Sequence, residues 1–324
     1  MEFFPVLIFI LSALGIYFSG ELVVNNIVRF SRFIGISSFI ASFFLMGIAS
    51  ALPNLFVGVN SAFNKIPQLS LGDVFGNDFI NLTLVISLAI LFSKDKNIKI
   101  DNVFVRESVI FMIVAALAPL FFAADNNLSR YDGFFLLILF DFYIWWSFSR
   151  KNYNYEDVYS KSYQPFKKIL LEWSFYKSFL KIIFGLVVLF FSAQGIIFSS
   201  KYFALKLNLP MVVIGMLIVG FGNALPETYF AVSSARKNET QLIFGNMVGS
   251  VIAPATLVLG IVSLIHPISI ENFSFLEINR LFYILVTILL LWFFERKKEL
   301  TKTNALILIL IYFVFLILIR NFIG

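Results

Sequence analysis

Ten long apolar runs, separated by short polar segments, constrain this chain more than any other feature. They lie near residues 3–23, 36–62, 71–93, 104–123, 133–149, 178–199, 209–235, 241–265, 281–294 and 304–322. A helix needs about 20 apolar residues to cross a bilayer. Only 14% of the residues are charged, against about 25% in ordinary soluble domains. The sequence therefore predicts an all-α integral membrane protein with about ten transmembrane helices, and it excludes a soluble enzyme and a nucleic-acid-binding module.

The distribution of Lys and Arg predicts how the chain is oriented in the bilayer. When the termini and connecting segments are assigned alternately to the two sides, one side receives 6 of the 25 basic residues and the other receives 19. The side with more positive charge faces the cytoplasm in membrane proteins. We therefore expect a multi-pass protein of the cell membrane, embedded in the lipid bilayer, with both termini on the extracytoplasmic side.

The chain also contains an internal repeat. A shift of 173 residues lays 47–85 over 220–258 without a gap, with 14 identities in 39 positions. Matched glycines and a matched proline at one offset are not explained by apolar composition, and they include the pairs Gly47/Gly220, Pro53/Pro226, Gly72/Gly245 and Gly76/Gly249.

The repeat predicts the organisation of the chain. Residues 1–149 form a first five-helix repeat, 150–177 a polar cytoplasmic loop, and 178–324 a second five-helix repeat. Because five is an odd number, the second repeat must enter the membrane inverted. Inverted repeats with interrupted helices near the midplane are typical of secondary transporters.

Prolines lie inside the spans at the centre of each repeat, at Pro53, Pro226 and Pro254. A proline removes one helical hydrogen bond and frees the carbonyl four residues earlier. In hydrocarbon that carbonyl needs protein, water or an ion as its partner. A simple kink satisfied by neighbouring helices is the alternative, but the symmetric placement of two prolines favours a polar site at interrupted helices.

Glu227 follows Pro226 and is the most informative residue of the chain. A carboxylate at the bilayer centre costs about 2.5–3.5 kcal/mol on insertion scales, so it needs a partner or a function. Glu227 is either a protonated acid that is hydrogen-bonded within the bundle, or a functional group: a cation ligand or a carboxyl group that exchanges a proton for a cation. We expect the second.

Helical spacing places further polar residues in groups, and the members of each group share one face of their helix. The groups are Ser50 with Asn54, Asn223 with Glu227, Asp73 with Asn77 and Asn81, and Asn246 with Ser250 and Pro254. Amide, hydroxyl and carboxylate oxygens suit hard cations such as Na⁺ or Ca²⁺. Asp78 points about 100° away from its neighbours on a helix, toward a second cavity or the bundle wall. Asp73 is either a site residue or a solvated acid near a helix end.

Enzymatic chemistry is not expected. The chain has no cysteine and one histidine, so thiolate sites and H-E-x-x-H metalloprotease motifs are both excluded. We predict no catalytic residues and no cofactor other than the transported cations.

Two paired segments carry a family resemblance. GIASALPN…LSLGDVFGNDFINLTLV and GFGNALPE…LIFGNMVGSVIAPATLV resemble the two alpha-repeats of the calcium/cation antiporter superfamily, specifically sodium/calcium exchangers of the prokaryotic type. The family pattern is G-[TN]-S-x-P-E followed by G-N-x-x-G-S-x-x-x-[ND]. The resemblance covers nearly the whole chain.

The resemblance implies particular ligands in this sequence. Glu227 matches the acidic ligand of the second repeat, and Ser250, Asn81, Ser50 and Asn223 match further ligand positions. Other positions depart from the pattern: Asn54 replaces an expected acid, Asn77 a serine, and Pro254 an aspartate. Asp73 or Asp78 would restore a second negative charge.

We therefore expect a secondary active cation antiporter that works by alternating access, with cations competing for a midplane site around Glu227. Na⁺ and either Ca²⁺ or H⁺ are the expected cations. One alternative is a monovalent cation/proton exchanger. The other is a degenerate, non-transporting homologue that acts as a membrane scaffold, which the loss of two expected acids favours.

Overall fold

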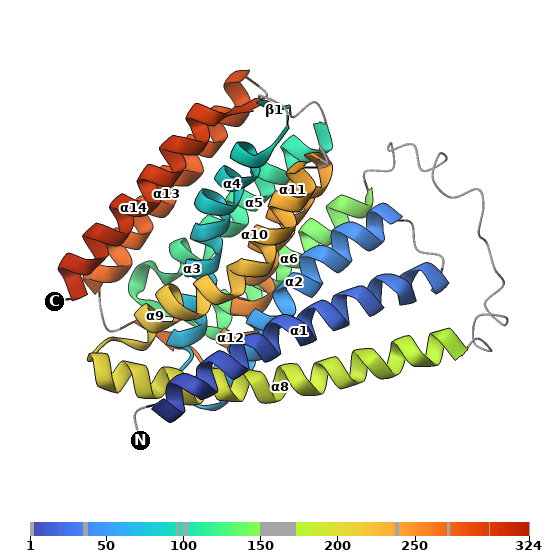
Figure 1. Cartoon of the computed structure of the whole chain (residues 1–324). Helices are drawn as coiled ribbons and strands as arrows, with labels where there is room; N and C mark the ends of the chain where they lie inside the picture. The colour runs from blue at the N-terminus through green and yellow to red at the C-terminus, as the bar shows by residue number, and fades with distance from the viewer. Residues whose placement is uncertain are drawn as a thin grey trace.

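The structure is a computed structural model of the chain, and it is almost entirely helical (Figure 1). It describes residues 3–34, 38–94, 97–99, 103–149, 173–236, 240–270, 273–297 and 299–323. Side chains between residues 27 and 50 lie outside this description, and so does most of the predicted loop, residues 150–172.

Seven helices continue without interruption. They are α1 (Phe3–Ile34), α2 (Ser38–Phe63), α5 (Val103–Phe122), α6 (Arg130–Ser149), α8 (Trp173–Leu207), α13 (Phe273–Lys297) and α14 (Lys302–Ile323). A short 3-10 helix, η2 (Ala123–Asp125), follows α5. Helices dominate because every backbone N–H and C=O must be paired when no water is present.

Three further helical segments each contain a π-helical turn. The first is α3 (Gln68–Ile80), η1 (Asn81–Val85) and α4 (Ile86–Phe92); the second is α9 (Met211–Ile214), η4 (Gly215–Val219) and α10 (Gly220–Arg236); the third is α11 (Thr240–Ile252), η5 (Ala253–Val258) and α12 (Leu259–Ile265). A π turn accommodates one extra residue within a helix, and such turns are frequent at functional sites. Under the shift of 173 residues, η1 falls within η5, so the two copies of the repeat share this irregularity.

The helices cover all the predicted apolar runs, with two differences at their ends. The predicted run 281–294 is too short, because α13 begins at Phe273 and includes polar residues in its first turns. The second difference is that α8 begins at Trp173, inside the predicted loop. Within the described residues, seven helices are long and apolar enough to cross a membrane.

The expected proline breaks at Pro53 and Pro226 are wrong, because α2 and α10 continue as helices through both residues. Proline inside a helix removes one hydrogen bond but keeps a helical φ, so the helical path can continue. Pro254 does lie in an irregular segment, since it falls at the start of η5.

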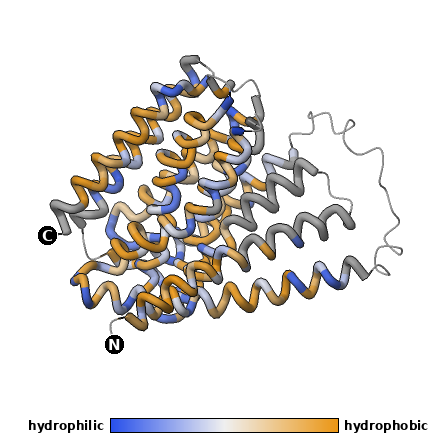
Figure 2. Tube along the Cα trace, in the orientation of Figure 1, coloured by the Kyte–Doolittle hydropathy of each residue, from blue (hydrophilic) through white to orange (hydrophobic). Residues whose placement is uncertain are grey.

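The molecule is apolar on the outside and polar in part of its interior. Figure 2 shows hydrophobic residues along most of the described helices. Many large apolar side chains are exposed, among them Phe3, Phe121, Tyr131 and Leu205, while 28 polar or charged side chains of the described residues are buried. An exposed apolar surface of this extent is explained by contact with lipid.

Two small antiparallel sheets connect the halves of the chain. β1 (Asn97–Lys99) pairs with β4 (Glu299–Thr301), and β2 (Asn127–Leu128) pairs with β3 (Ile268–Ser269). The sheets lie at opposite ends of α5, which runs from β1 to β2. Each sheet therefore joins a connection of the first half to a connection of the second.

The two halves also contact each other through α1 and α8, which lie side by side in Figure 1. A Cβ atom added to Gly15 would overlap Ser192 Oγ, and one added to Gly195 would overlap Ser12 Oγ. Both helices carry Ser-Ala-x-Gly here. Small residues let the two backbones approach closely, as is typical of helix pairs in membranes.

The central helices pack across the two halves. α2 packs against α11 and η5, while α10 packs against α3, η1 and α4. Each proline-containing helix thus contacts the glycine-rich helix of the other half. α3 also approaches α9 and η4 closely, since a Cβ atom on Gly72 would overlap the Val212 carbonyl oxygen and one on Gly76 the Met216 carbonyl oxygen.

Candidate cation site

The polar stripe of α3 faces the interior of the bundle. Asp73, Asn77 and Asn81 are all fully buried, and Asn81 begins the π turn η1. Their helical spacing predicts a shared face. The alternative that Asp73 is a solvated acid near the helix end is therefore wrong, because neighbouring helices cover it.

Four buried amide side chains have no hydrogen-bond partner among the described residues, and three of them belong to the predicted site. These three are Asn54 on α2, Asn77 on α3 and Asn81 on η1, and in each of them both the nitrogen and the oxygen are unpaired. An unpaired buried polar group costs about 1–3 kcal/mol, so such groups are rare in proteins. Three together indicate that this region receives a polar ligand.

Asp73 is connected directly to the second half of the chain. Asn223 Nδ2 on α10 donates a hydrogen bond to Asp73 Oδ1 over 2.9 Å. Asp73 Oδ2 remains buried without a partner. One carboxylate oxygen is therefore fixed and the other is available to a ligand.

Glu227 lies one turn after Asn223 on α10 and is 5% exposed. Its Oε2 atom is buried and unpaired. Among the described residues, neither Glu227 nor Asp73 forms an ion pair with Lys, Arg or His, since the ion pair found there joins Arg106 to Glu295. The negative charge of Glu227 is thus not neutralised by a basic side chain of the described structure.

Asp78 points to the bundle wall, one of the two expected directions. Tyr283 of α13 donates a hydrogen bond from its hydroxyl to Asp78 Oδ2 over 3.1 Å, while Asp78 Oδ1 is buried and unpaired. Asp78 is also within electrostatic range of Asp73 and Glu227. The charges of the three acids therefore influence one another.

The stripe of the second half contains no acid. Asn246 on α11 is buried with an unpaired Nδ2, and Ser250 Oγ donates to the Met247 carbonyl over 3.2 Å. Pro254 lies in η5 and closes this stripe. Ser50, the remaining predicted ligand, lies on the part of α2 whose side chains are outside the description.

The acids do not converge on a single point. In the part of the chain that the structure describes, no three His, Asp or Glu side chains are grouped closely enough to hold one metal ion. A cation bound here would therefore take amide, hydroxyl or carbonyl oxygens together with one or two carboxylates.

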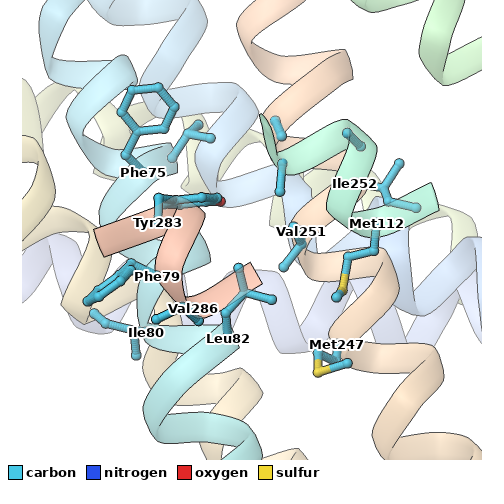
Figure 3. Packing of buried hydrophobic residues seen from close by; sticks show 14 of the residues in the cluster. Phe75, Phe79, Ile80, Leu82, Met112, Met247, Val251, Ile252, Tyr283 and Val286 are labelled. Atoms are coloured by element: carbon cyan, nitrogen blue, oxygen red, sulfur yellow. The ribbon is translucent and has the colours of Figure 1, made fainter. Parts of the chain in front are cut away.

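Sequence reasoning missed Tyr283 and Asn279, which lie one turn apart on α13. Both are fully buried, and both amide atoms of Asn279 are unpaired. Figure 3 shows Tyr283 between Phe75 and Phe79 of α3. A tyrosine in an apolar run carries no signal in the sequence that distinguishes it from a residue at the lipid interface, so its role depends on the packing of α13.

The candidate site combines buried acids that have no basic partner in the described structure with unpaired amides, and its helices come from both halves of the chain. This arrangement defines a multi-pass membrane protein of the transporter class. The chain belongs to the sodium/calcium exchanger protein family, whose model matches residues 4–149 and 177–320. Membership of this family supports a cation antiporter.

Relatives match along most of their length. The chain is 26% identical over 309 residues to an uncharacterized membrane protein of Methanocaldococcus jannaschii, covering 94% of this chain and 95% of the relative. It is 23% identical to the sodium/calcium exchanger MaX1 of Methanosarcina acetivorans, covering 96% and 98% of the two chains. It is also 23% identical to the inner membrane protein YrbG of Escherichia coli, covering 82% and 81%.

Solved structures of the sodium-calcium exchanger NCX_Mj share the fold. The structure soaked with sodium and strontium ions matches with a TM-score of 0.65 at 22% identity, covering 97% of this chain and 98% of that one. The structure soaked without sodium and calcium matches with a TM-score of 0.62 over the same shares.

Proposed function

We propose that this protein is a secondary active cation antiporter of the sodium/calcium exchanger type, in which cations compete in turn for a midplane site around Glu227. The observation that carries this proposal is the set of unpaired, buried polar atoms on α2, α3 and α10 beside acids that have no described basic partner. Buried charges require partners, and cations supply them. Asn54, Asn77, Asn81, Asn223, Ser50 and Ser250 would complete the site.

The acids of α3 explain how the site holds cations despite its departures from the family pattern. The pattern leads us to expect acids at 54 and 254, where this chain has Asn54 and Pro254. Asp73 and Asp78 lie within electrostatic range of Glu227 and of each other. They would supply, from a different helix, the negative charge that positions 54 and 254 lack.

We further propose that the two halves are inverted repeats with ten crossings and with both termini on the extracytoplasmic side. The reciprocal sheets support this proposal, because the shift of 173 residues places β2 on β4 and β1 directly after β3. The contacts between α1 and α8 are reciprocal in the same way, because Ser12 faces Gly195 and Gly15 faces Ser192. We expect α1 and α8 to move together across the central helices during alternating access.

A monovalent cation/proton exchanger is the second candidate. It is favoured by the separation of the acids, because no three acidic side chains of the described residues are close enough to bind one metal ion. Ca²⁺ takes six to eight oxygen ligands, usually with several carboxylates, whereas a single carboxylate balances a monovalent ion. In this case Glu227 would bind a proton and a cation alternately.

Transport measurements in liposomes test these proposals. Uptake of radioactive sodium, uptake of radioactive calcium and proton movement would be followed under imposed gradients, for the natural protein, Glu227→Gln and Glu277→Gln. Glu277 is an exposed glutamate of α13 and serves as the matched control. We expect Glu227→Gln to abolish exchange and Glu277→Gln to preserve it.

Each outcome assigns the protein to one candidate. Sodium-driven calcium uptake supports the exchanger, and sodium movement coupled only to protons supports the second candidate. Exchange that survives Glu227→Gln would refute the central site. The absence of flux under every gradient would indicate a membrane scaffold.

A further inference from the structure

The hydroxyl of Tyr283 is held in place by its surroundings. Its ring lies 6.2 Å from the ring of Phe75 and 6.3 Å from that of Phe79, measured between centroids. Tyr283 and Asp78 are both fully buried, and Figure 3 shows Phe75 and Phe79 of α3 on either side of the tyrosine. The hydrogen bond to Asp78 Oδ2 is therefore a fixed feature of the site rather than a surface contact.

This bond makes the two oxygens of Asp78 unequal. Oδ2 accepts from the hydroxyl, and Oδ1 has no partner among the described residues. Each carboxylate oxygen has two lone pairs, so the hydroxyl takes one lone pair of Oδ2 and competes there with a cation. Ca²⁺ takes carboxylates through one or both oxygens, in a shell of six to eight ligands.

The bond also changes how the carboxylate treats cations of different charge. A hydrogen bond donated to a carboxylate offsets part of its negative charge at the ion. Coulomb energy scales with the product of the charges, so the same reduction weakens binding of a divalent cation twice as much, in free energy, as binding of a monovalent one.

We infer that Tyr283 is a positioning residue that sets the cation preference of the site, because its hydroxyl offsets part of the negative charge of Asp78 and thereby favours monovalent over divalent cations. This inference rests on the proposed function, since Asp78 must act on a bound cation. It assigns a part in ion selection to α13, which lies outside the matched segments 47–85 and 220–258.

Tyr283→Phe tests the inference because it removes the hydroxyl and keeps the ring between Phe75 and Phe79. The readouts are the half-saturating sodium concentration for uptake into liposomes and the calcium concentration that halves this uptake. Hydrogen bonds to charged groups contribute enough for about a tenfold effect. We expect the calcium value to fall by about tenfold and the sodium value by about threefold, so that their ratio shifts toward calcium.

Tyr312→Phe is the matched control. Tyr312 of α14 also packs on Phe79, at 6.1 Å between centroids, and it has no hydrogen bond to the described acids. Its substitution should leave the ratio of the two concentrations unchanged. In an Asp78→Asn background, Tyr283→Phe should also have no effect on the ratio, because the tyrosine acts through Asp78.

The outcomes separate this inference from the proposed function. No sodium uptake by the natural protein would refute the proposed function itself. Normal uptake by the natural protein with an unchanged ratio in Tyr283→Phe would overturn only the role of Tyr283. A lower unfolding temperature with an unchanged ratio would show a purely structural role, and it would overturn the inference as well.

Discussion

Asn223 of α10 holds Asp73 of α3 through a buried hydrogen bond of 2.9 Å between Nδ2 and Oδ1. The two residues are 150 positions apart in sequence and belong to different halves of the chain. Asn223 is one turn before Glu227, so this bond connects the acid of one half to the acid-bearing helix of the other. The geometry of the candidate site therefore depends on both halves at once.

Removal of the Asp73 charge should weaken cation binding. Asp73→Asn keeps the size of the side chain but takes one negative charge from an unneutralised cluster, so we expect the half-saturating sodium concentration to rise by at least about tenfold. Asp141→Asn changes an exposed aspartate of α6 and should have no effect. Equal values for Asp73→Asn and the natural protein would place Asp73 outside the site.

Loss of the Asn223 amide should destabilise the protein through Asp73. Asn223→Ala leaves a buried carboxylate oxygen without its donor, which we expect to cost about 1–3 kcal/mol of unfolding free energy. Thermal unfolding in detergent would measure it as a lower midpoint. In a double-mutant cycle with Asp73→Asn, the two effects should be clearly non-additive; simple additivity would contradict the coupling.

Two glycines at equivalent positions of the repeat should respond differently to alanine. A Cβ atom on Gly72 would overlap the Val212 carbonyl oxygen, whereas one on Gly245 would meet nothing within 4 Å. Gly72→Ala should therefore force α3 away from α9 and destabilise by about 1–3 kcal/mol. Gly245→Ala should be neutral or slightly stabilising, because alanine favours a helix. Thermal unfolding of both variants would check this, and equal midpoints would contradict the packing described.

The absence of cysteine makes the topology directly testable. Single cysteines at Leu207, at the exposed end of α8, and at Lys94, after α4, should lie on opposite sides of the membrane. A maleimide that cannot cross membranes should label Leu207→Cys in intact cells, and Lys94→Cys only after the cells are opened. Labelling of both variants in intact cells would refute the predicted orientation.

The sequence predicted the fold class because charge and helical spacing act locally. Apolar runs located the helices, and Asp73, Asn77 and Asn81 were predicted to share one helix face, which the structure buries. The bond between Asn223 and Asp73 could not be predicted, because it depends on how α3 and α10 pack across the halves. Tyr283 was missed for the same reason.

The irregular backbone also could not be predicted in full. Proline is a visible signal, and the sequence placed interruptions at Pro53 and Pro226, where the helices continue. The structure has π turns at 81–85 and 215–219 without any proline in them. The position of these turns follows from the packing of whole helices, and no single residue type in the sequence indicates it.

The pairing of β1 with β4 has a consequence for how the chain is made. These strands are separated by about two hundred residues of sequence, from Asn97 to Thr301, so the sheet cannot form until almost the whole chain has been synthesised. The polar stripe of α3 likewise stays uncovered until α10 (Gly220–Arg236) has been made, and exposed surface of this kind favours misassembly. We expect separately expressed halves, divided within 150–172, to accumulate in the membrane only when both are made in the same cell.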